Sequence, residues 1–129
     1  VNEFSSQDNL DQLYDRVCKI FKGFNKDLGS TKSLLVRQMG ANYASEFADN
    51  SVDFVYLDGD HQYEPVKSEI EAWYPKVRIG GILAGHDYVE RSHIEEFGVI
   101  PAVNEFIKRE ELQLNTTTEH FATWWITKT

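Results

Sequence analysis

The fold is decided by residues 52–88, which read VDFVYLDGDHQYEPVKSEIEAWYPKVRIGGILAGHDY. Residues 52–57 and 81–84 are short apolar runs of the kind that buried central strands use. Between the two runs, apolar side chains recur at spacings of four, three and four residues, at Val66, Ile70, Trp73 and Val77. This spacing predicts an amphipathic helix, and Pro65 stands where such a helix can begin. A strand, a crossover helix and a second strand together predict a right-handed parallel unit.

Two polar clusters follow these predicted strands. The cluster Asp58-Gly59-Asp60-His61 comes directly after the first strand, and His86-Asp87-Tyr88 comes after the second. The carboxyl ends of neighbouring parallel strands lie at the same edge of a sheet, which is where open α/β sheets bind ligands. We therefore expect the two clusters to meet in one site.

The chemistry available in this site is acidic. Three carboxylates and two imidazoles come together, from Asp58, Asp60, Asp87, His61 and His86. Like charges packed so closely either raise a carboxyl pKa or recruit a cation. Oxygen ligands favour Mg²⁺ or Ca²⁺, and the histidines also admit Mn²⁺ or Zn²⁺. A purely structural role is the alternative, because an aspartate at a strand end often caps the next helix and Asp-Gly is a frequent turn pair.

The rest of the chain also alternates helices and strands, which predicts a single α/β domain over residues 1–129. The other predicted elements are helices over residues 9–24 and 42–48, a strand over residues 33–38, a helix that begins near Pro101, and an antiparallel hairpin of strands 112–116 and 122–127. On the central helix, Lys67 and Glu69 are interpreted as part of a solvated face. The predicted fold is therefore a mostly parallel sheet that ends in an antiparallel hairpin.

Composition narrows the possible partners and the cellular setting. The chain carries 21 acidic residues against 13 Lys and Arg, with a formal charge of −8, which argues against a nucleic-acid partner. Cys18 is the single cysteine, so no intramolecular disulfide can form, and its place among apolar helix positions favours a buried thiol. No stretch approaches the roughly 20 apolar residues that span a bilayer, and the polar start lacks a signal-peptide pattern. We expect a soluble, cytoplasmic protein.

Residues 52–88 strongly resemble the second half of class I S-adenosylmethionine-dependent methyltransferases of the family 24 type. The resemblance covers most of the chain and is most specific in this stretch. It implies a partial Rossmann-like sheet, in which the run before Asp58 is the family's fourth strand, the run through Leu83 its fifth, and the closing hairpin its sixth and seventh. It also implies S-adenosylmethionine as cofactor and a small hydroxylated molecule as methyl acceptor.

The same resemblance implies a metal site. Similar O-methyltransferases that act on catechols and sugars hold Mg²⁺ with an aspartate after the fourth strand and an acidic pair after the fifth. By position, Asp58 and Asp87 correspond to metal ligands, and His86 replaces an acid as the third. Asp60 or His61 is then expected to act as the catalytic base.

Cofactor contacts follow from the resemblance in the same way. The family's second strand ends in an acid that holds the ribose hydroxyls, and only Glu3 can match it. After the third strand, relatives often place an acidic or hydroxyl residue near the adenine, whereas this chain has Gly40-Ala41-Asn42. Asn42 can still hydrogen-bond a base edge. The expected cofactor-binding set is therefore Glu3, Gly40, Asn42 and Asp58.

The family opens with a strand and a Gly-rich turn beside the methionine part of the cofactor, and no such motif precedes Asn9. With a first residue that is Val1, this predicts an incomplete methyltransferase-like domain. The family's first strand lies beside its fourth, so its absence leaves an unpaired strand edge, which is costly. We therefore expect either that residues 33–38 pair directly with residues 52–57, or that two chains form a homodimer over the exposed edge.

Three functional hypotheses remain open from the sequence. The first is a methyltransferase descended from a metal-assisted O-methyltransferase. The second is a non-catalytic remnant or binding module of the same fold, which the absent Gly-rich turn favours. The third interprets Asp58-Gly59-Asp60 as the Asp-x-Asp motif of a metal-dependent sugar-nucleotide transferase, although the Gly-Gly-Ile-Leu strand and the closing hairpin argue against it.

Overall fold

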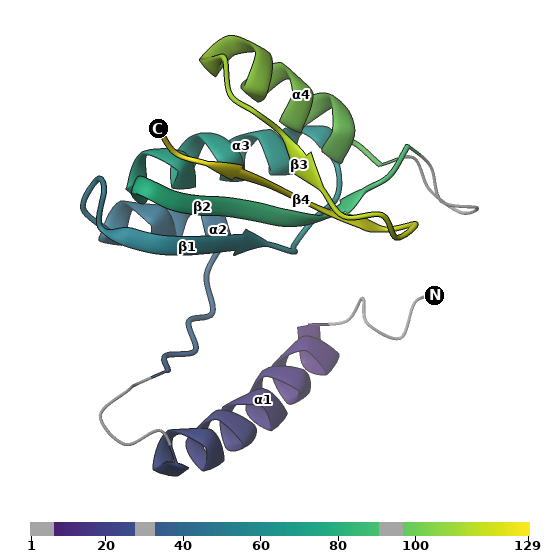
Figure 1. The fold of residues 1–129 in the computed structure, drawn as a ribbon. Coiled ribbons are helices and arrows are strands. Elements are labelled where there is room, and N and C mark those ends of the chain that lie inside the picture. Colours follow the sequence, from purple (N-terminus) through teal and green to yellow (C-terminus); the bar gives the residue numbers. More distant parts are fainter. Residues whose placement is uncertain (1–6, 28–32, 91–96) are drawn as a thin grey trace. The chain divides into compact units, whose positions relative to one another are not determined.

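The computed structural model describes residues 7–27, 33–90 and 97–129 (Figure 1). The chain divides into two units, Val1–Gln38 and Met39–Thr129, and each is described by itself. No helix in the described residues has both the length and the apolar character needed to cross a membrane.

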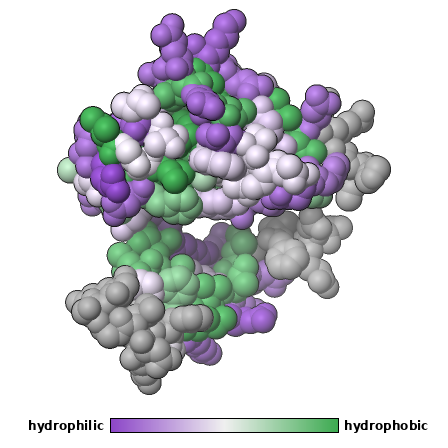
Figure 2. All heavy atoms as spheres, viewed as in Figure 1, coloured by the Kyte–Doolittle hydropathy of each residue, from purple (hydrophilic) through white to green (hydrophobic). Residues whose placement is uncertain are grey.

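The first unit contains helix α1, Gln7–Asp27. The predicted helix over residues 9–24 is confirmed, although it continues past Gly23 for a further turn. Arg37 contacts this helix, because its Nη2 lies 2.5 Å from Asp11 Oδ1 and its guanidinium lies over the Tyr14 ring. The hydrogen bond from Arg37 is the main reason that the pKa of Asp11 is lowered. Hydrophobic side chains gather on the face of this unit that Figure 2 shows. Cys18 is half-buried.

The predicted strand over residues 33–38 is wrong. This segment has no regular secondary structure, and the described sheet contains no strand from it. The expected pairing of residues 33–38 with residues 52–57 is therefore also wrong. Leu34 is 76% exposed, which shows that this apolar run does not find a surface to pack against within its own unit. An apolar run becomes a strand only where a neighbouring strand supplies backbone hydrogen bonds and packing.

The second unit is built on a four-stranded sheet in the order β1-β2-β4-β3. The strands are β1, Val52–Leu57; β2, Val77–Tyr88; β3, Asn115–Thr116; and β4, Ala122–Thr127. Strand β1 pairs with β2 in parallel, and β4 pairs with both β2 and β3 in antiparallel fashion, so the parallel unit and the closing hairpin are confirmed. The first hairpin strand is shorter than predicted.

Helix α3, Tyr63–Trp73, connects β1 to β2, as the spacing of apolar residues predicts. Val77 is an exception, because it begins β2 and does not lie on the helix. A 3₁₀ turn over Tyr74–Lys76 separates the two elements. Pro75 in this turn lacks the N–H that a continuing α-helix needs.

Helices α3 and α4, Val99–Glu110, cover one face of the sheet (Figure 1). The core between them and the sheet consists of Val55, Val66, Ile70, Val77, Leu83, Val99, Ala102, Val103, Phe106, Trp124 and Ile126. The predicted helix near Pro101 is thus confirmed. The predicted helix over residues 42–48 is found as two short turns, α2, Gly40–Tyr43, and a 3₁₀ turn over Ala44–Glu46.

Strand β1 lies at one edge of this sheet. Its side chains that point away from the helices include Phe54 and Tyr56, which are 55% and 42% exposed and stack on each other. Within the described residues, the outer edge of β1 has no partner strand. The unpaired edge that the sequence predicts is therefore present.

Candidate active site

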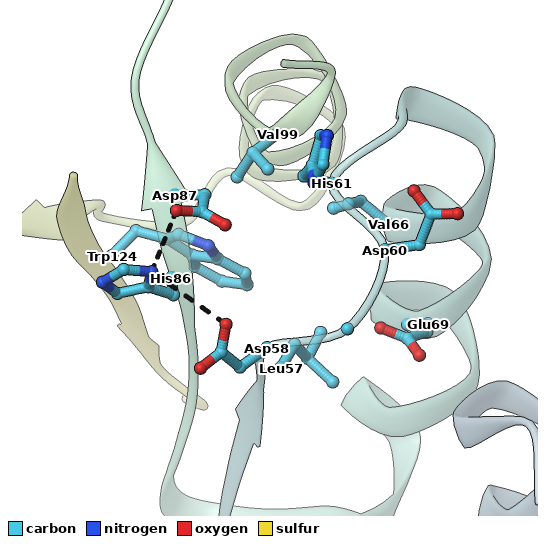
Figure 3. A pocket seen from close by; sticks show the side chains of 11 residues that line it. Leu57, Asp58, Asp60, His61, Val66, Glu69, His86, Asp87, Val99 and Trp124 are labelled. Carbon is cyan, nitrogen blue, oxygen red and sulfur yellow. Dashed lines mark ion pairs between the residues drawn. The ribbon is translucent and has the colours of Figure 1, made fainter. Parts of the chain in front are cut away.

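The carboxyl ends of β1 and β2 lie side by side and carry the two polar clusters. In the parallel register, Leu57 pairs with Gly85, so the next residues, Asp58 and His86, lie beside each other. His86 and Asp87 belong to the last part of β2, which extends beyond the predicted strand. Figure 3 shows Asp58, His86 and Asp87 pointing toward one another. The expectation that the two clusters meet at one edge of the sheet is confirmed.

The distances among these three residues are compatible with a metal ion between them. His86 Nδ1 lies 2.9 Å from Asp87 Oδ1 and 4.0 Å from Asp58 Oδ1. One ligand atom from each residue lies within 4.8 Å of the other two. Ligands about 2.0–2.3 Å from a small divalent cation are themselves about 3–4 Å apart, so small side-chain rotations suffice to bring them to one ion.

The backbone fixes Asp87 in an unusual conformation. Its φ is 58°, in the left-handed region that few residues other than glycine adopt, and which Asp and Asn tolerate best. The Val89 N–H donates to the Asp87 carbonyl at 2.8 Å, and the Tyr88 hydroxyl donates to Asn104 Oδ1 at 2.8 Å. The first bond closes a tight turn at Asp87, and the second ties the end of β2 to α4.

Asp60 and His61 lie on the opposite side of the same cavity. Asp60 Oδ1 accepts a hydrogen bond from the Gln62 N–H at 2.8 Å, so the aspartate closes the turn before α3. In Figure 3 its carboxylate is turned away from Asp58, His86 and Asp87. The His61 ring packs on Phe97 with centroids 4.3 Å apart. Asp60 therefore has the structural role that the sequence offers as the alternative, because it closes the turn before α3.

Two hollows flank Asp58 and Gly59. The smaller hollow, of about 10 Å³, lies among the acidic residues and His86, and the ring of Trp124 lines it. This is close to the space that one buried water needs. The larger hollow, of about 400 Å³, extends along the edge of β1 and is lined mainly by apolar side chains. Its size is within the range of small-molecule sites.

A family model described as a methyltransferase domain matches residues 6–88, which is more than half of the chain. The chain belongs to this methyltransferase domain family. The resemblance to class I S-adenosylmethionine-dependent methyltransferases is therefore confirmed. The family assignment also favours a methyltransferase over the sugar-nucleotide transferase that the Asp-x-Asp motif suggests.

Comparison with individual proteins agrees with the family. The methyltransferase domain is 36% identical over 58 residues to an uncharacterized protein of Acanthamoeba polyphaga mimivirus, covering 45% of this chain and 25% of that protein. A solved protein of Corynebacterium glutamicum has a TM-score of 0.61 at 19% identity, covering 84% of this chain and 54% of that one. An O-methyltransferase family protein of Burkholderia thailandensis has a TM-score of 0.64 at 13% identity, covering 90% and 41%. These similarities confirm the fold, and the chain spans only about a quarter to a half of these relatives.

Two of the four predicted cofactor residues of the methyltransferase domain lie on the same hollow. Gly40 and Asp58 both line the larger hollow. Asn42 is not among the residues that line it, and its carbonyl accepts a hydrogen bond from the Ser45 hydroxyl. Glu3 lies outside the described residues. The Trp73 indole N–H donates to the Gly40 carbonyl at 3.0 Å, which holds the start of α2 against α3 beside the hollow.

Glu69 is a site residue that the sequence interpretation missed. It lines both hollows and is half-buried, so the solvated face predicted for it is wrong. Burial raises the pKa of the Glu69 carboxyl, and the charge of Asp60 adds to this effect. A signal was available in the sequence, because Glu69 follows the core residue Val66 by three positions and precedes Trp73 by four. That spacing places its side chain on the flank of the buried face.

Proposed function

We propose that this methyltransferase domain transfers the methyl group of S-adenosylmethionine to a hydroxyl oxygen of a small molecule, assisted by a divalent cation, Mg²⁺. The observation that carries the proposal is the convergence of Asp58, His86 and Asp87 within 4.8 Å at the carboxyl edge of the sheet. Two carboxylates and one imidazole beside a cavity of about 10 Å³ suit a single divalent ion.

In this proposal Asp58, His86 and Asp87 would hold the cation next to the acceptor hydroxyl. A bound cation supplies a Lewis acid that lowers the pKa of the acceptor hydroxyl. Asp58, which lines both hollows, lies between the acceptor and the methyl donor. Holding the two reactants in line contributes to the rate by removing the entropy cost of their encounter.

Asp60 and His61 are the proposed catalytic bases of this reaction. Both line the smaller hollow opposite the three metal ligands. Asp60 uses Oδ1 to accept the Gln62 N–H, and its Oδ2 would take the acceptor's proton once the side chain turns toward the three converging residues. His61 is held by Phe97 and by the Gly98 N–H, which donates to the His61 carbonyl at 2.8 Å.

The larger hollow has a volume of about 400 Å³ and extends from Gly40 and Asp58 to Phe54 and Tyr56. The proposed place of the nucleoside part of the cofactor is the end lined by the predicted cofactor residues Gly40 and Asp58, which leaves the end at Phe54 and Tyr56 for the partner copy proposed below. Apolar walls suit a nucleobase, and the position next to Asp58 brings the methyl donor to the acceptor side.

Calorimetric titration tests this function directly. The wild-type chain is titrated with S-adenosylhomocysteine and with Mg²⁺, each alone and in the presence of the other. The proposal expects both to bind and each to strengthen the other. Binding of neither would support the second hypothesis, a non-catalytic module that keeps the fold. Binding of Mg²⁺ with no effect of S-adenosylhomocysteine would also contradict the proposal.

We also propose that two copies of this chain associate through the edge of β1. The edge has no partner in the described sheet, and Phe54 and Tyr56 beside it are exposed. Natural proteins usually protect such edges with charge or by pairing. Phe54→Lys is expected to shift the chain toward monomer in sedimentation velocity experiments. Ile79→Lys, which changes another exposed apolar residue on β2, is the control. A wild-type chain that stays monomeric at all concentrations would contradict the association.

A further inference from the structure

The carboxylate of Glu69 occupies the space that a side chain at position 40 would take. A Cβ atom placed on Gly40 would lie 2.6 Å from Glu69 Oε1, and one placed on Gly59 would lie 3.6 Å from the same oxygen. Gly40 begins α2 and Gly59 lies in the loop after β1, and both line the larger hollow beside Glu69. Glu69 of helix α3 therefore places a carboxylate beside Gly40, which itself has no acidic side chain.

The Glu69 carboxylate is a hydrogen-bond acceptor with no hydrogen-bond donor among the described residues around it. Because it lines the larger hollow, a ligand bound there could supply that donor. Its half-buried position and the nearby charge of Asp60 both oppose ionisation, which is why the Glu69 pKa is raised. A partly buried carboxylate gains most when a ligand supplies N–H or O–H groups.

The wall next to Glu69 suits a flat apolar group. Trp73 and Phe47 line the larger hollow with ring centroids 5.3 Å apart, and Val55 and Leu57 line it from β1. The indole of Trp73 is fixed by its hydrogen bond to the Gly40 carbonyl. A planar base can therefore pack on apolar side chains while its polar edge meets a carboxylate at one end.

We propose that Glu69 accepts a hydrogen bond from the exocyclic amine of the adenine ring of the cofactor. This inference rests on the proposed function, because it assigns a contact within the same cofactor site. The amine offers two N–H donors, whereas a base with a carbonyl at that position would present an oxygen to the carboxylate and be repelled. Glu69 is thus a residue that selects adenine.

The test compares two ligands on matched variants. The ligands are S-adenosylhomocysteine and its analogue in which hydrogen replaces the exocyclic amine. The variants are Glu69→Ala, the conservative Glu69→Gln, and the control Glu64→Ala, which changes an exposed acid in the first turn of the same helix. Dissociation constants are measured by calorimetry, and far-ultraviolet circular dichroism checks that each variant is folded.

The wild-type chain and Glu64→Ala are expected to bind the amine-lacking analogue about tenfold more weakly than S-adenosylhomocysteine, the usual size of a hydrogen bond to a charged group. Glu69→Ala is expected to bind both ligands alike. Glu69→Gln keeps an amide oxygen as acceptor and is expected to keep part of the preference. Because the two changes act on one contact, their effects should not add.

A relocated carboxylate provides a rescue. The φ of Gly40 lies outside the left-handed region, so an aspartate is accommodated there once Glu69 is shortened. The double variant Gly40→Asp with Glu69→Ala is expected to regain several-fold preference for the amine. Equal binding of both ligands by the wild-type chain, or an unchanged preference in Glu69→Ala, would overturn the inference while leaving the proposed function intact. Failure of the wild-type chain to bind S-adenosylhomocysteine at all would overturn both.

Discussion

The two sides of the proposed active site are built in different ways. On one side, which we call the strand wall, Asp58, His86 and Asp87 follow or end two paired strands, and the parallel register sets their spacing. On the other side, the helix wall, Asp60, His61 and Glu69 come from a loop and from helix α3. The strand wall brings its ligand atoms together before any ligand binds, whereas the groups of the helix wall lie apart.

This difference has a chemical reason. A cation needs several ligand atoms within a few tenths of an ångström of their final places, which paired strands supply well. A catalytic base, or a residue that selects a ligand, needs only one atom within hydrogen-bond distance of its target. A loop held by single hydrogen bonds is sufficient to position such an atom. We therefore expect changes in the strand wall to abolish activity and changes in the helix wall to alter rate, pH dependence or ligand choice.

The largest effect is expected from Asp87→Asn. Asparagine tolerates the left-handed backbone of residue 87, so the substitution removes a charged ligand without adding backbone strain. Methyl transfer is expected to fall about 1,000-fold or more, because a bound cation contributes several kcal/mol to the rate, and Mg²⁺ binding is expected to weaken in calorimetry. Glu90→Gln, which changes an exposed acid just beyond the same strand, is the control. Unchanged Mg²⁺ affinity in Asp87→Asn would contradict the claim that the strand wall, and not the helix wall, binds the cation.

A smaller loss of methyl-transfer activity is expected from Asp60→Asn. The asparagine oxygen can still accept the Gln62 N–H, so the turn before α3 is preserved. Loss of a general base lowers the rate by about 100-fold, while Mg²⁺ and S-adenosylhomocysteine should bind as before. If Asp60→Asn keeps full activity, His61 is the base, and the same measurements on His61→Asn decide that assignment.

Tyr88→Phe should have a moderate effect on the strand wall. The substitution removes the hydrogen bond from the Tyr88 hydroxyl to Asn104 Oδ1, which ties the end of β2 to α4. We expect the free energy of unfolding in urea to fall by about 1 kcal/mol and the rate to fall a few-fold. Tyr43→Phe is the matched control, because that hydroxyl makes no hydrogen bond with the described residues. Equal free energies of unfolding for both variants would show that the Tyr88–Asn104 hydrogen bond does not stabilise the strand wall.

The smallest effect is expected from Glu69→Gln in the absence of ligand. Because the folded state raises the Glu69 pKa above its usual value of 4.5, the ionised carboxylate is destabilising, and stability is lost as pH rises from about 4.5 through the folded pKa. A neutral glutamine removes this loss. The variant should be more stable than the wild-type chain at pH 7, by less than about 1 kcal/mol because the side chain is half exposed, and equally stable below pH 4. Lower stability at pH 7 would contradict this.

The strand wall was predictable from the sequence, and the helix wall only in part. Two apolar runs, one helical spacing and two acidic clusters are sufficient to place Asp58 beside Asp87, because parallel pairing leaves little freedom at the strand ends. Glu69 was missed because a charged residue on a helix is usually solvated, and its burial depends on Gly40, a residue distant in the sequence.

The error at residues 33–38 has a different cause. The run Leu34-Leu35-Val36 has the composition of a strand, but composition does not provide a partner strand. The long β2 was also only partly predicted, because glycines at positions 80 and 81 are not typical of a strand. Gly80 adopts a φ of 76°, which only glycine adopts readily, and the pairing with β1 shifts in register there while the strand continues.

The central claim is that Asp58, His86 and Asp87 bind one divalent cation. The most direct test is an anomalous difference map, measured at the manganese absorption edge, from crystals of the chain grown with Mn²⁺ and S-adenosylhomocysteine. We predict a single strong peak about 2.0–2.3 Å from one atom of each of the three side chains. A map with S-adenosylhomocysteine bound and no peak among these three residues would contradict the claim.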